Sequence, residues 1–176
     1  MESLRVNHLI CSMKTLINML ILLLIVSTGL SAGAQTTRKE KKAAKITAIK
    51  NNIDNKKYTF IANNAIPLGG GTRQLTSEYD LRITPDSVIS FLPYFGVAHF
   101  DVPYGSTDMG IKFTSTKFDY KATAKKNGGW EITIKPKDVK NLQSMTLYIS
   151  SEGYGSLGVT SVNRDYISFD GFLKEN

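Results

Sequence analysis

The 176-residue sequence contains one cysteine, Cys11, and two histidines, His8 and His99. Cys11 precedes an apolar run near the N-terminus, so a chain processed after that run contains no cysteine and only His99. Disulfide bonds and thiolate metal ligands are then excluded, and one histidine is too few for zinc. Cys-His catalysis is excluded as well, and a Ser-His-Asp triad would have to use His99. We therefore expect no metal, no cofactor and no enzymatic activity.

Phosphate and calcium motifs are also missing. The glycines of residues 69–71 lack the G-K-[ST] ending of a phosphate loop, and no βα pattern surrounds them. Asp101 and Asp108 do not follow the spacing of an EF-hand loop. Paired carboxylates for glycoside hydrolysis stay open, because their separation is spatial rather than sequential. A hydrolase is therefore the third and last of the function hypotheses.

The N-terminus predicts a signal peptide over residues 1–34, cleaved after Ala34. Residues 16–26 are apolar apart from Asn18, Lys14 precedes them, and small residues follow from Ser31. The run is shorter than the roughly 18 residues of a spanning helix, although an uncleaved anchor is the alternative. Because Cys11 lies before the run, we expect no lipoprotein anchor, and a periplasmic or secreted protein. Met13 is an alternative start, which would leave residues 1–12 outside the protein.

The positive charge is confined to residues 35–57. This segment has eight basic residues against two acidic ones, while the remainder of the processed chain is balanced. Lys42, Ile46, Ile49 and Ile53 recur at helical spacing, which predicts a basic amphipathic helix over residues 38–52.

This helix has two interpretations. In the first it docks on the body of the protein and its charged side is simply solvated. In the second it attaches the protein to an anionic surface, such as a membrane or polysaccharide. Nucleic acid is a disfavoured partner, because no aromatic residues interleave the lysines. The candidate surface-binding residues are Lys39, Lys41, Lys42 and Lys45.

Residues 58–176 predict a single antiparallel β domain. Its clearest element is a hairpin in which Trp130, Ile132 and Ile134 alternate with polar residues. A three-residue loop, 126–128, pairs Ala124 with Trp130 and places Gly128 in the left-handed position that such a loop needs. Ala122 and Ala124 then share the core face, where they would leave room for bulky side chains from another layer.

The other strands are predicted from the same alternation. A first strand, 58–62, ends at two asparagines, and the remaining apolar segments are 79–84, 88–92, 97–100, 145–150, 156–162 and 166–173. Proline and glycine between 93 and 96 indicate a strand end or a bend. About eight short strands with regular turns predict a mainly β fold, an antiparallel meander forming a sandwich or an up-and-down barrel.

Aromatic residues gather around the turns. Core packing is expected to account for most of them. The set is Tyr94, Phe95, Phe100, Tyr104, Tyr148, Tyr154 and Tyr166. His99 lies in an apolar run, so we expect it in or near the core. The remaining possibility is a concave, apolar-lined site at one end of the sheet, with Arg164 either holding a turn or binding an acidic ligand group. The candidate ligand-binding residues are Tyr94, Phe95, His99, Tyr104 and Arg164.

Four stretches resemble a bacterial family catalogued as domain of unknown function 4251. They are residues 89–96, residues 112–115, residues 129–132, and residues 163–164 together with 167–171. The resemblance runs from about residue 45 to residue 173 and implies an exported envelope protein with one domain and no assigned activity. The first function hypothesis is a non-enzymatic domain that binds an apolar or mixed small ligand or an envelope partner. The second is a structural or interaction protein held to an anionic surface by its basic helix.

Overall fold

The computed structural model describes residues 37–100, 110–126 and 128–174. The chain divides into two compact units, Met1–Ala44 and Lys45–Asn176, and a helix covers residues 37–54. The strands of the second unit are β1 (Tyr58–Pro67), β2 (Arg73–Ile83), β3 (Val88–Leu92), β4 (Ile111–Ser115), β5 (Phe118–Ala124), β6 (Trp130–Pro136), β7 (Leu142–Ile149), β8 (Tyr154–Ser161) and β9 (Ile167–Leu173).

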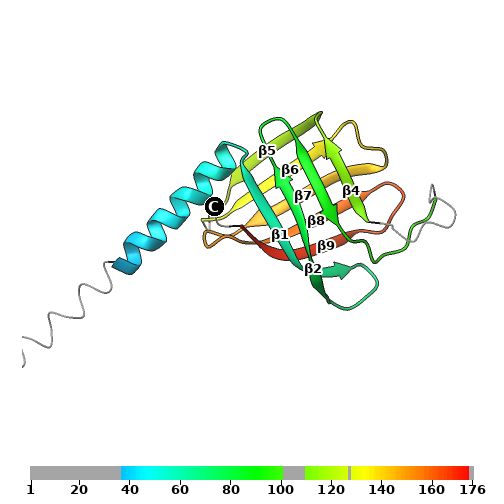
Figure 1. Ribbon diagram of the computed structural model, residues 1–176, viewed down its shortest axis with the longest axis horizontal. Helices are drawn as coiled ribbons and strands as arrows, with labels where there is room; N and C mark the ends of the chain where they lie inside the picture. Colours follow the sequence, from blue (N-terminus) through cyan, green and yellow to red (C-terminus); the bar gives the residue numbers. More distant parts are fainter. Residues whose placement is uncertain (1–36, 101–109, 127, 175–176) are drawn as a thin grey trace, which may run out of the picture. The chain divides into compact units, whose positions relative to one another are not determined.

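These nine strands form one antiparallel sheet that curls into a nearly closed barrel. Their order is β4-β3-β2-β1-β9-β8-β7-β6-β5, so the first strand pairs with the last. Figure 1 shows β1 to β4 in front of β5 to β9. The two ends of the sheet are β4 and β5, which follow each other in sequence. The predicted mainly β meander is confirmed, and of the two predicted forms it takes the barrel.

A single carboxylate ties the β4–β5 connection to the end of β6. Asp138 accepts hydrogen bonds from the backbone N–H groups of Thr116 (2.9 Å) and Lys117 (3.2 Å) and from the hydroxyl of Ser115. The N–H of Lys137 donates to the carbonyl of Lys117 at 2.7 Å. The Ser115 hydrogen bond, followed by that from Thr116, lowers the pKa of Asp138 to about 2.

The hairpin between β5 and β6 has the predicted register. Ala124 pairs with Trp130 and Ala122 with Ile132, and Gly128 has φ = 82°. The expectation for the alanines is wrong, however, because Ala122 and Ala124 are exposed. The reason is that β5 is an edge strand of the sheet, so Ala122 and Ala124 have a neighbouring strand, β6, on one side only.

Side chains fill the inside of the barrel. Phe60 is one of two phenylalanines with no exposed surface, and its ring lies against Gly155 and Gly171. A Cβ atom on Gly171 would lie 3.0 Å from the Phe60 ring and 1.9 Å from the carbonyl oxygen of Ile61, and one on Gly155 would lie 3.4 Å from that ring. Glycine is required at 171 because the neighbouring backbone comes too close for any side chain. The other fully buried large side chains are Phe169, Ile53, Leu81, Ile83, Leu92, Ile132, Ile134, Met145, Leu147, Leu157 and Ile167.

The helix is slightly longer than predicted, and its isoleucine stripe is confirmed. Ile49 (6% exposed) and Ile53 (0%) belong to the barrel core, and Ile46 packs against it. After residue 54 the N–H of Lys57 donates to the carbonyl of Asn52 (2.9 Å) and that of Lys56 to Ile53 (3.1 Å). This is a Schellman ending, with Lys56 in the left-handed position at φ = 52°.

Two tyrosines fasten this helix end to the sheet. The Tyr120 hydroxyl donates to the carbonyl of Ile53 (3.2 Å), and the Tyr58 and Tyr120 hydroxyls are 3.1 Å apart. Because Tyr120 uses its only proton on Ile53, Tyr58 must be the donor between the two. Burial raises the pKa of Tyr120 and, still more, that of Tyr58, where the neighbouring Tyr120 adds to the effect.

Two strand boundaries differ from the predictions by five or more residues. β1 does not end at its asparagines but continues to Pro67, because a bulge between Ala62 and Asn64 absorbs the irregular residue. β2 begins at Arg73, six residues before the predicted start, over a polar stretch without apolar alternation. The predicted strand at 97–100 is reduced to one bridge between Ala98 and Arg164.

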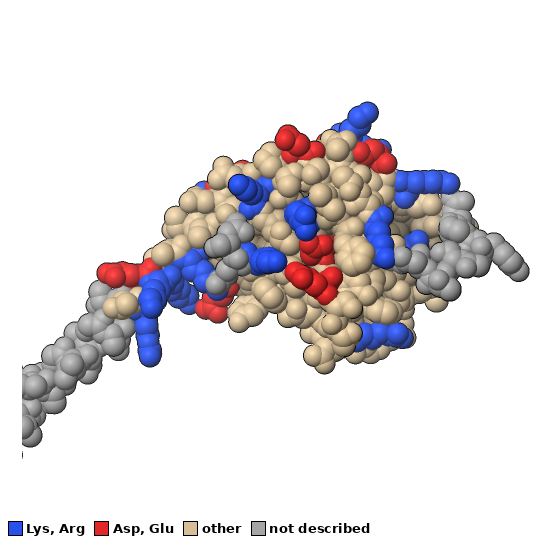
Figure 2. Space-filling model, in the orientation of Figure 1, with Lys and Arg blue, Asp and Glu red and all other residues tan. Residues whose placement is uncertain are grey.

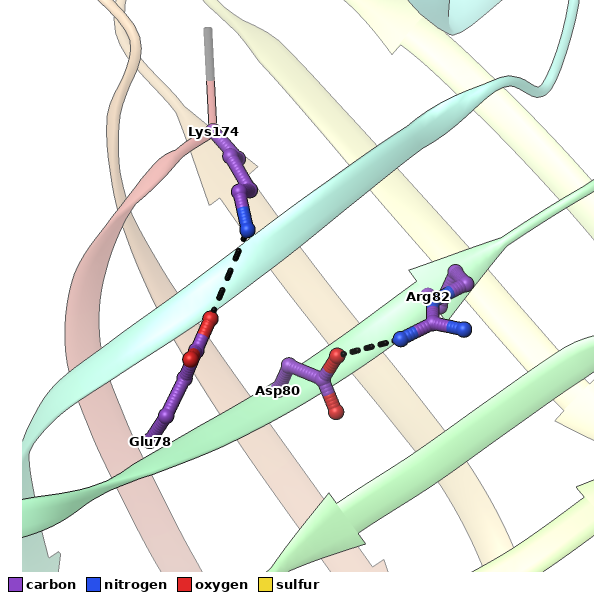
Figure 3. A network of polar contacts seen from close by, with 4 residues as sticks. All are labelled: Glu78, Asp80, Arg82 and Lys174. Atoms are coloured by element: carbon purple, nitrogen blue, oxygen red, sulfur yellow. Dashed lines mark hydrogen bonds and ion pairs between the residues drawn. The ribbon is translucent and has the colours of Figure 1, made fainter. Parts of the chain in front are cut away.

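Charges of both signs are interspersed on the sheet surface seen in Figure 2. On β2, Arg82 and Asp80 form an ion pair at 3.2 Å, and Lys174 approaches Glu78 at 3.5 Å (Figure 3). Exposed pairs of this kind contribute little to stability.

Candidate functional site

Three of the five predicted ligand residues, Tyr94, His99 and Arg164, meet where segment 93–100 lies against the β8–β9 turn. The N–H of His99 donates to the carbonyl of Asn163 (2.9 Å), and that of Asp165 donates to Val97 (3.0 Å). The side-chain amide of Asn163 donates to Phe100 at 3.0 Å. These bonds fix the segment on the turn without a regular strand.

Tyr94 is the anchor of this contact. Its side chain is 8% exposed, and its hydroxyl lies 2.8 Å from the carbonyl of Val97 and 3.1 Å from that of Asp165. The guanidinium of Arg164 stacks over the ring at 5.1 Å. Burial, and then the Asp165 carboxylate, raise the pKa of Tyr94, so its hydroxyl remains a proton donor. Little of Tyr94 is therefore offered to a ligand.

The other predicted ligand residues are partly dispersed. The imidazole Nε2 of His99 lies 2.8 Å from Asp165 Oδ1, and its side chain is 55% exposed, so the expectation of a core histidine is wrong. An apolar sequence run does not bury its residues where the backbone forms no strand. The ring of Phe95 instead lies under the guanidinium of Arg73, at 4.9 Å. Tyr104 lies outside the described residues.

A small cleft beside this region is lined by cations. Its volume is about 240 Å³, and Lys112, Lys140 and Arg164 contribute to its walls together with Asn141 and Asn163. None of the residues described along this cleft is acidic. Arg164 thus stacks on Tyr94 and also borders the cleft.

A larger groove lies elsewhere, on the outer face of β7, β8 and β9. Because Met145, Leu147 and Ile149 face the core, Tyr148 points outward. Tyr148 is 50% exposed and Tyr154 66%, and both line the groove, whose volume is about 550 Å³. In the strand register Tyr148 is directly opposite Ser156. Tyr154, two residues before Ser156, is therefore the diagonal neighbour of Tyr148, about 7–8 Å away.

Polar groups form one side of this groove. Ser156 pairs with Asp170 across β8 and β9, and Tyr154 pairs with Phe172. The Asp170 carboxylate and the Ser156 hydroxyl form no hydrogen bond or ion pair with the part of the chain that the structure describes. Lys125, also in the lining, is paired with Glu131, which raises the pKa of Lys125 through their hydrogen bond.

A second cleft adjoins the groove along Tyr154. It has a volume of about 520 Å³ and is lined by Tyr154, Phe172, Asn63 and Glu152, among others. Tyr154 thus lines both hollows.

Core packing was expected for most of the aromatic residues near the turns, but Tyr148, Tyr154 and Tyr166 are 50%, 66% and 44% exposed, as is Phe100 at 53%. The signal that could have found them is the alternation itself. An odd-numbered core face on residues 145–149 places Tyr148 outside.

The family described as "Domain of unknown function (DUF4251)" matches residues 40–173. The chain belongs to this family. The resemblance inferred from the four sequence stretches is thereby confirmed. A crystal structure of a DUF4251 family protein from Bacteroides eggerthii is similar, with a TM-score of 0.54 and 16% sequence identity over 75% of this chain and 90% of that one. At this identity the likeness concerns the fold of the DUF4251 domain. The search of curated proteins gives no match.

Two further findings concern the described residues alone. They contain no helix that is both long and apolar enough to cross a bilayer, and no group of three or more His, Cys, Asp or Glu side chains arranged to hold a metal ion. The candidate surface lysines lie on the helix, where all four are exposed: Lys39, Lys41, Lys42 and Lys45.

Proposed function

We propose that this DUF4251 protein is an exported, non-enzymatic binding domain. Its ligand is a small molecule, or part of an envelope component, that has both apolar and hydrogen-bonding surface. Export is inferred from the signal peptide predicted over residues 1–34, which also favours a periplasmic or secreted location.

The observation that supports binding most is the groove between Tyr148 and Tyr154. Its volume of about 550 Å³ falls within the range of about 300–1,000 Å³ usual for ligand sites. Neighbouring exposed tyrosines with polar groups next to them are typical of recognition surfaces, because an aromatic ring offers contact area at small entropic cost. The barrel interior, by contrast, is occupied by side chains such as Phe60 and Phe169.

Mass spectrometry of small molecules that co-purify with the protein tests this proposal. The protein expressed from its full-length sequence is compared with a Tyr148→Ala/Tyr154→Ala variant. We expect at least one compound to be retained by the former and depleted in the latter. Identical retained compounds, with both proteins folded by circular dichroism, would contradict a binding role for the groove.

The second candidate function is attachment to an anionic surface through the basic helix. The exposure of Lys39, Lys41, Lys42 and Lys45 supports it. Co-sedimentation with vesicles containing anionic lipid, at 50 mM and 500 mM salt, tests it, because attachment by exposed lysines weakens with ionic strength. Binding that does not change with salt, or that persists when all four lysines are replaced by glutamine, would exclude this mode of attachment.

A further inference from the structure

Three aromatic side chains stand on successive strands of one exposed sheet face. Tyr148 is on β7, Tyr154 on β8 and Phe172 on β9, with exposed fractions of 50%, 66% and 36%. Cross-strand pairing places Phe172 directly beside Tyr154. Exposed apolar side chains that gather in this way mark a contact surface rather than the scatter usual on a monomer.

The row next to this aromatic pair is polar. Ser156 and Asp170 face each other one step along β8 and β9, and neither side chain has a hydrogen-bond partner in the described chain. An ionised carboxylate only accepts hydrogen bonds, and its two oxygens can take two donors at once. The matching ligand group therefore presents two adjacent donors, as a vicinal diol does, beside an apolar C–H surface that can lie on an aromatic ring.

Charge narrows the choice of ligand further. An anionic ligand would meet the Asp170 carboxylate within the groove. A cationic ligand would suit the aromatic rings and Asp170, but it would come close to the ammonium group of Lys125 in the groove lining. A neutral ligand rich in hydroxyl groups meets neither obstacle.

The second cleft indicates an extended ligand. It continues the surface beyond Tyr154 and adds Phe172, Asn63 and Glu152 to the contacts. The two hollows, of about 550 Å³ and 520 Å³, together offer room for several linked rings.

We propose that the groove binds a neutral oligosaccharide, an inference that rests on the binding function proposed above. The pyranose rings stack on Tyr148 and Tyr154 and continue toward Phe172. Their hydroxyl groups donate to the carboxylate of Asp170 and exchange hydrogen bonds with Ser156.

Titration with defined neutral hexasaccharides tests this inference. Cellohexaose, maltohexaose, xylohexaose and chitohexaose are added to the protein expressed from its full-length sequence. Binding is followed by calorimetry and by the fluorescence of Trp130, the only tryptophan, which lines the groove. We expect at least one to bind, and more tightly than its disaccharide, since only the longer chain reaches the second cleft.

Variants locate the bound sugar. Tyr148→Ala and Tyr154→Ala are each expected to weaken binding by about fivefold or more, from the loss of one stacking contact. Asp170→Asn should weaken it too, because an amide replaces one acceptor oxygen by a donor. Tyr166→Ala is the matched control: Tyr166 is an exposed tyrosine of the same β8–β9 region that covers Gly158 and lines neither cleft, so its removal should leave binding unchanged.

Three results would overturn the inference. If no hexasaccharide binds while a co-purified compound still depends on Tyr148 and Tyr154, the oligosaccharide is refuted and the binding function stands. If tetramethylammonium chloride binds instead, and Tyr154→Ala abolishes this, the groove is a cation site. Absence of hexasaccharide binding together with absence of any groove-dependent compound would refute both the oligosaccharide and the proposed function.

Discussion

Replacing Gly96 by alanine should destabilise the protein through Tyr94 alone. A Cβ atom at position 96 would lie 2.4 Å from the Tyr94 hydroxyl oxygen and 2.7 Å from its ring carbon Cζ, closer than atoms can approach. Gly96 is not among the residues with positive φ, so alanine is compatible with the backbone itself. The new methyl group must therefore displace the tyrosine ring from its place between Val97 and Asp165.

The size of the effect follows from what Tyr94 loses. Exposing an aromatic ring that is now 8% exposed costs about 1.5–3 kcal/mol, and losing its hydrogen bond about 1 kcal/mol more. Alanine offsets about 0.4–1 kcal/mol of this, because it reduces the entropy of the unfolded chain relative to glycine. We expect Gly96→Ala to lower the free energy of unfolding by about 2–3 kcal/mol.

A double-mutant cycle makes the prediction specific. Urea unfolding, followed by the fluorescence of Trp130, is measured for Gly96→Ala, Tyr94→Ala and both together. Once Tyr94 is absent, Gly96→Ala should cost nothing, so the two changes should be strongly non-additive. Additive losses would refute the reasoning, because they would mean that the methyl group clashes with something other than Tyr94.

Gly158→Ala provides the matched control. A Cβ there would also lie 2.4 Å from a tyrosine hydroxyl, that of Tyr166. Tyr166 is 44% exposed, however, and can swing into solvent, so we expect a loss below about 1 kcal/mol.

Three further predictions concern pH and the helix end. Asp138 has a folded-state pKa of about 2, below its ordinary 3.8, so the unfolded state takes up the proton first, and the stability contributed by Asp138 is lost as pH falls from about 4 through 2. The urea midpoints of wild type and Asp138→Asn should therefore converge between pH 5 and pH 2. A constant difference between them would contradict this. Because the pKa of Tyr58 is raised in the folded state, the unfolded chain ionises first above pH 10, and stability should fall there by up to about 1.4 kcal/mol per pH unit. Tyr58→Phe should reduce this fall in the same urea series. The same slope of stability against pH in the variant and the wild type would disprove the prediction. Lys56→Gly should stabilise the protein by about 0.5 kcal/mol in urea unfolding. Glycine removes the left-handed backbone strain at φ = 52°, and part of this gain is offset by losing the contact of the Lys56 ammonium with the Tyr120 ring at 5.2 Å. A clear loss of stability would show that this contact outweighs the strain.

Local patterns were sufficient to predict the β5–β6 hairpin and the N-terminal helix of this fold. The register of the β5–β6 hairpin follows from Trp130, Ile132 and the left-handed Gly128, all within a few residues of the turn. The isoleucine stripe that packs the helix against the core can likewise be predicted from the helical spacing of the isoleucines in the sequence. Each of these features depends on neighbours in sequence.

The unpredicted features depend on residues far apart in the chain. The exposure of Ala122 and Ala124 follows from the place of β5 at the sheet edge, which no hairpin can indicate. The exposed His99 pairs with Asp165, 66 residues away. The oligosaccharide-binding groove proposed here needs the register of three strands, so Tyr148 and Asp170 could not be related before that register was known.

The pairing of β1 with β9 governs the order in which the protein can fold. Before β9 is in place, β1–β4 and β5–β8 are two separate meanders that no strand ladder connects. The barrel therefore cannot close until the last segment has been synthesised and, if the protein is exported unfolded, translocated. Ladders between segments so far apart in sequence form slowly, and during that time β1 and β8 each present an open edge. A chain cut before Ile167 would leave both edges open permanently, and we expect it to aggregate rather than to form a smaller barrel.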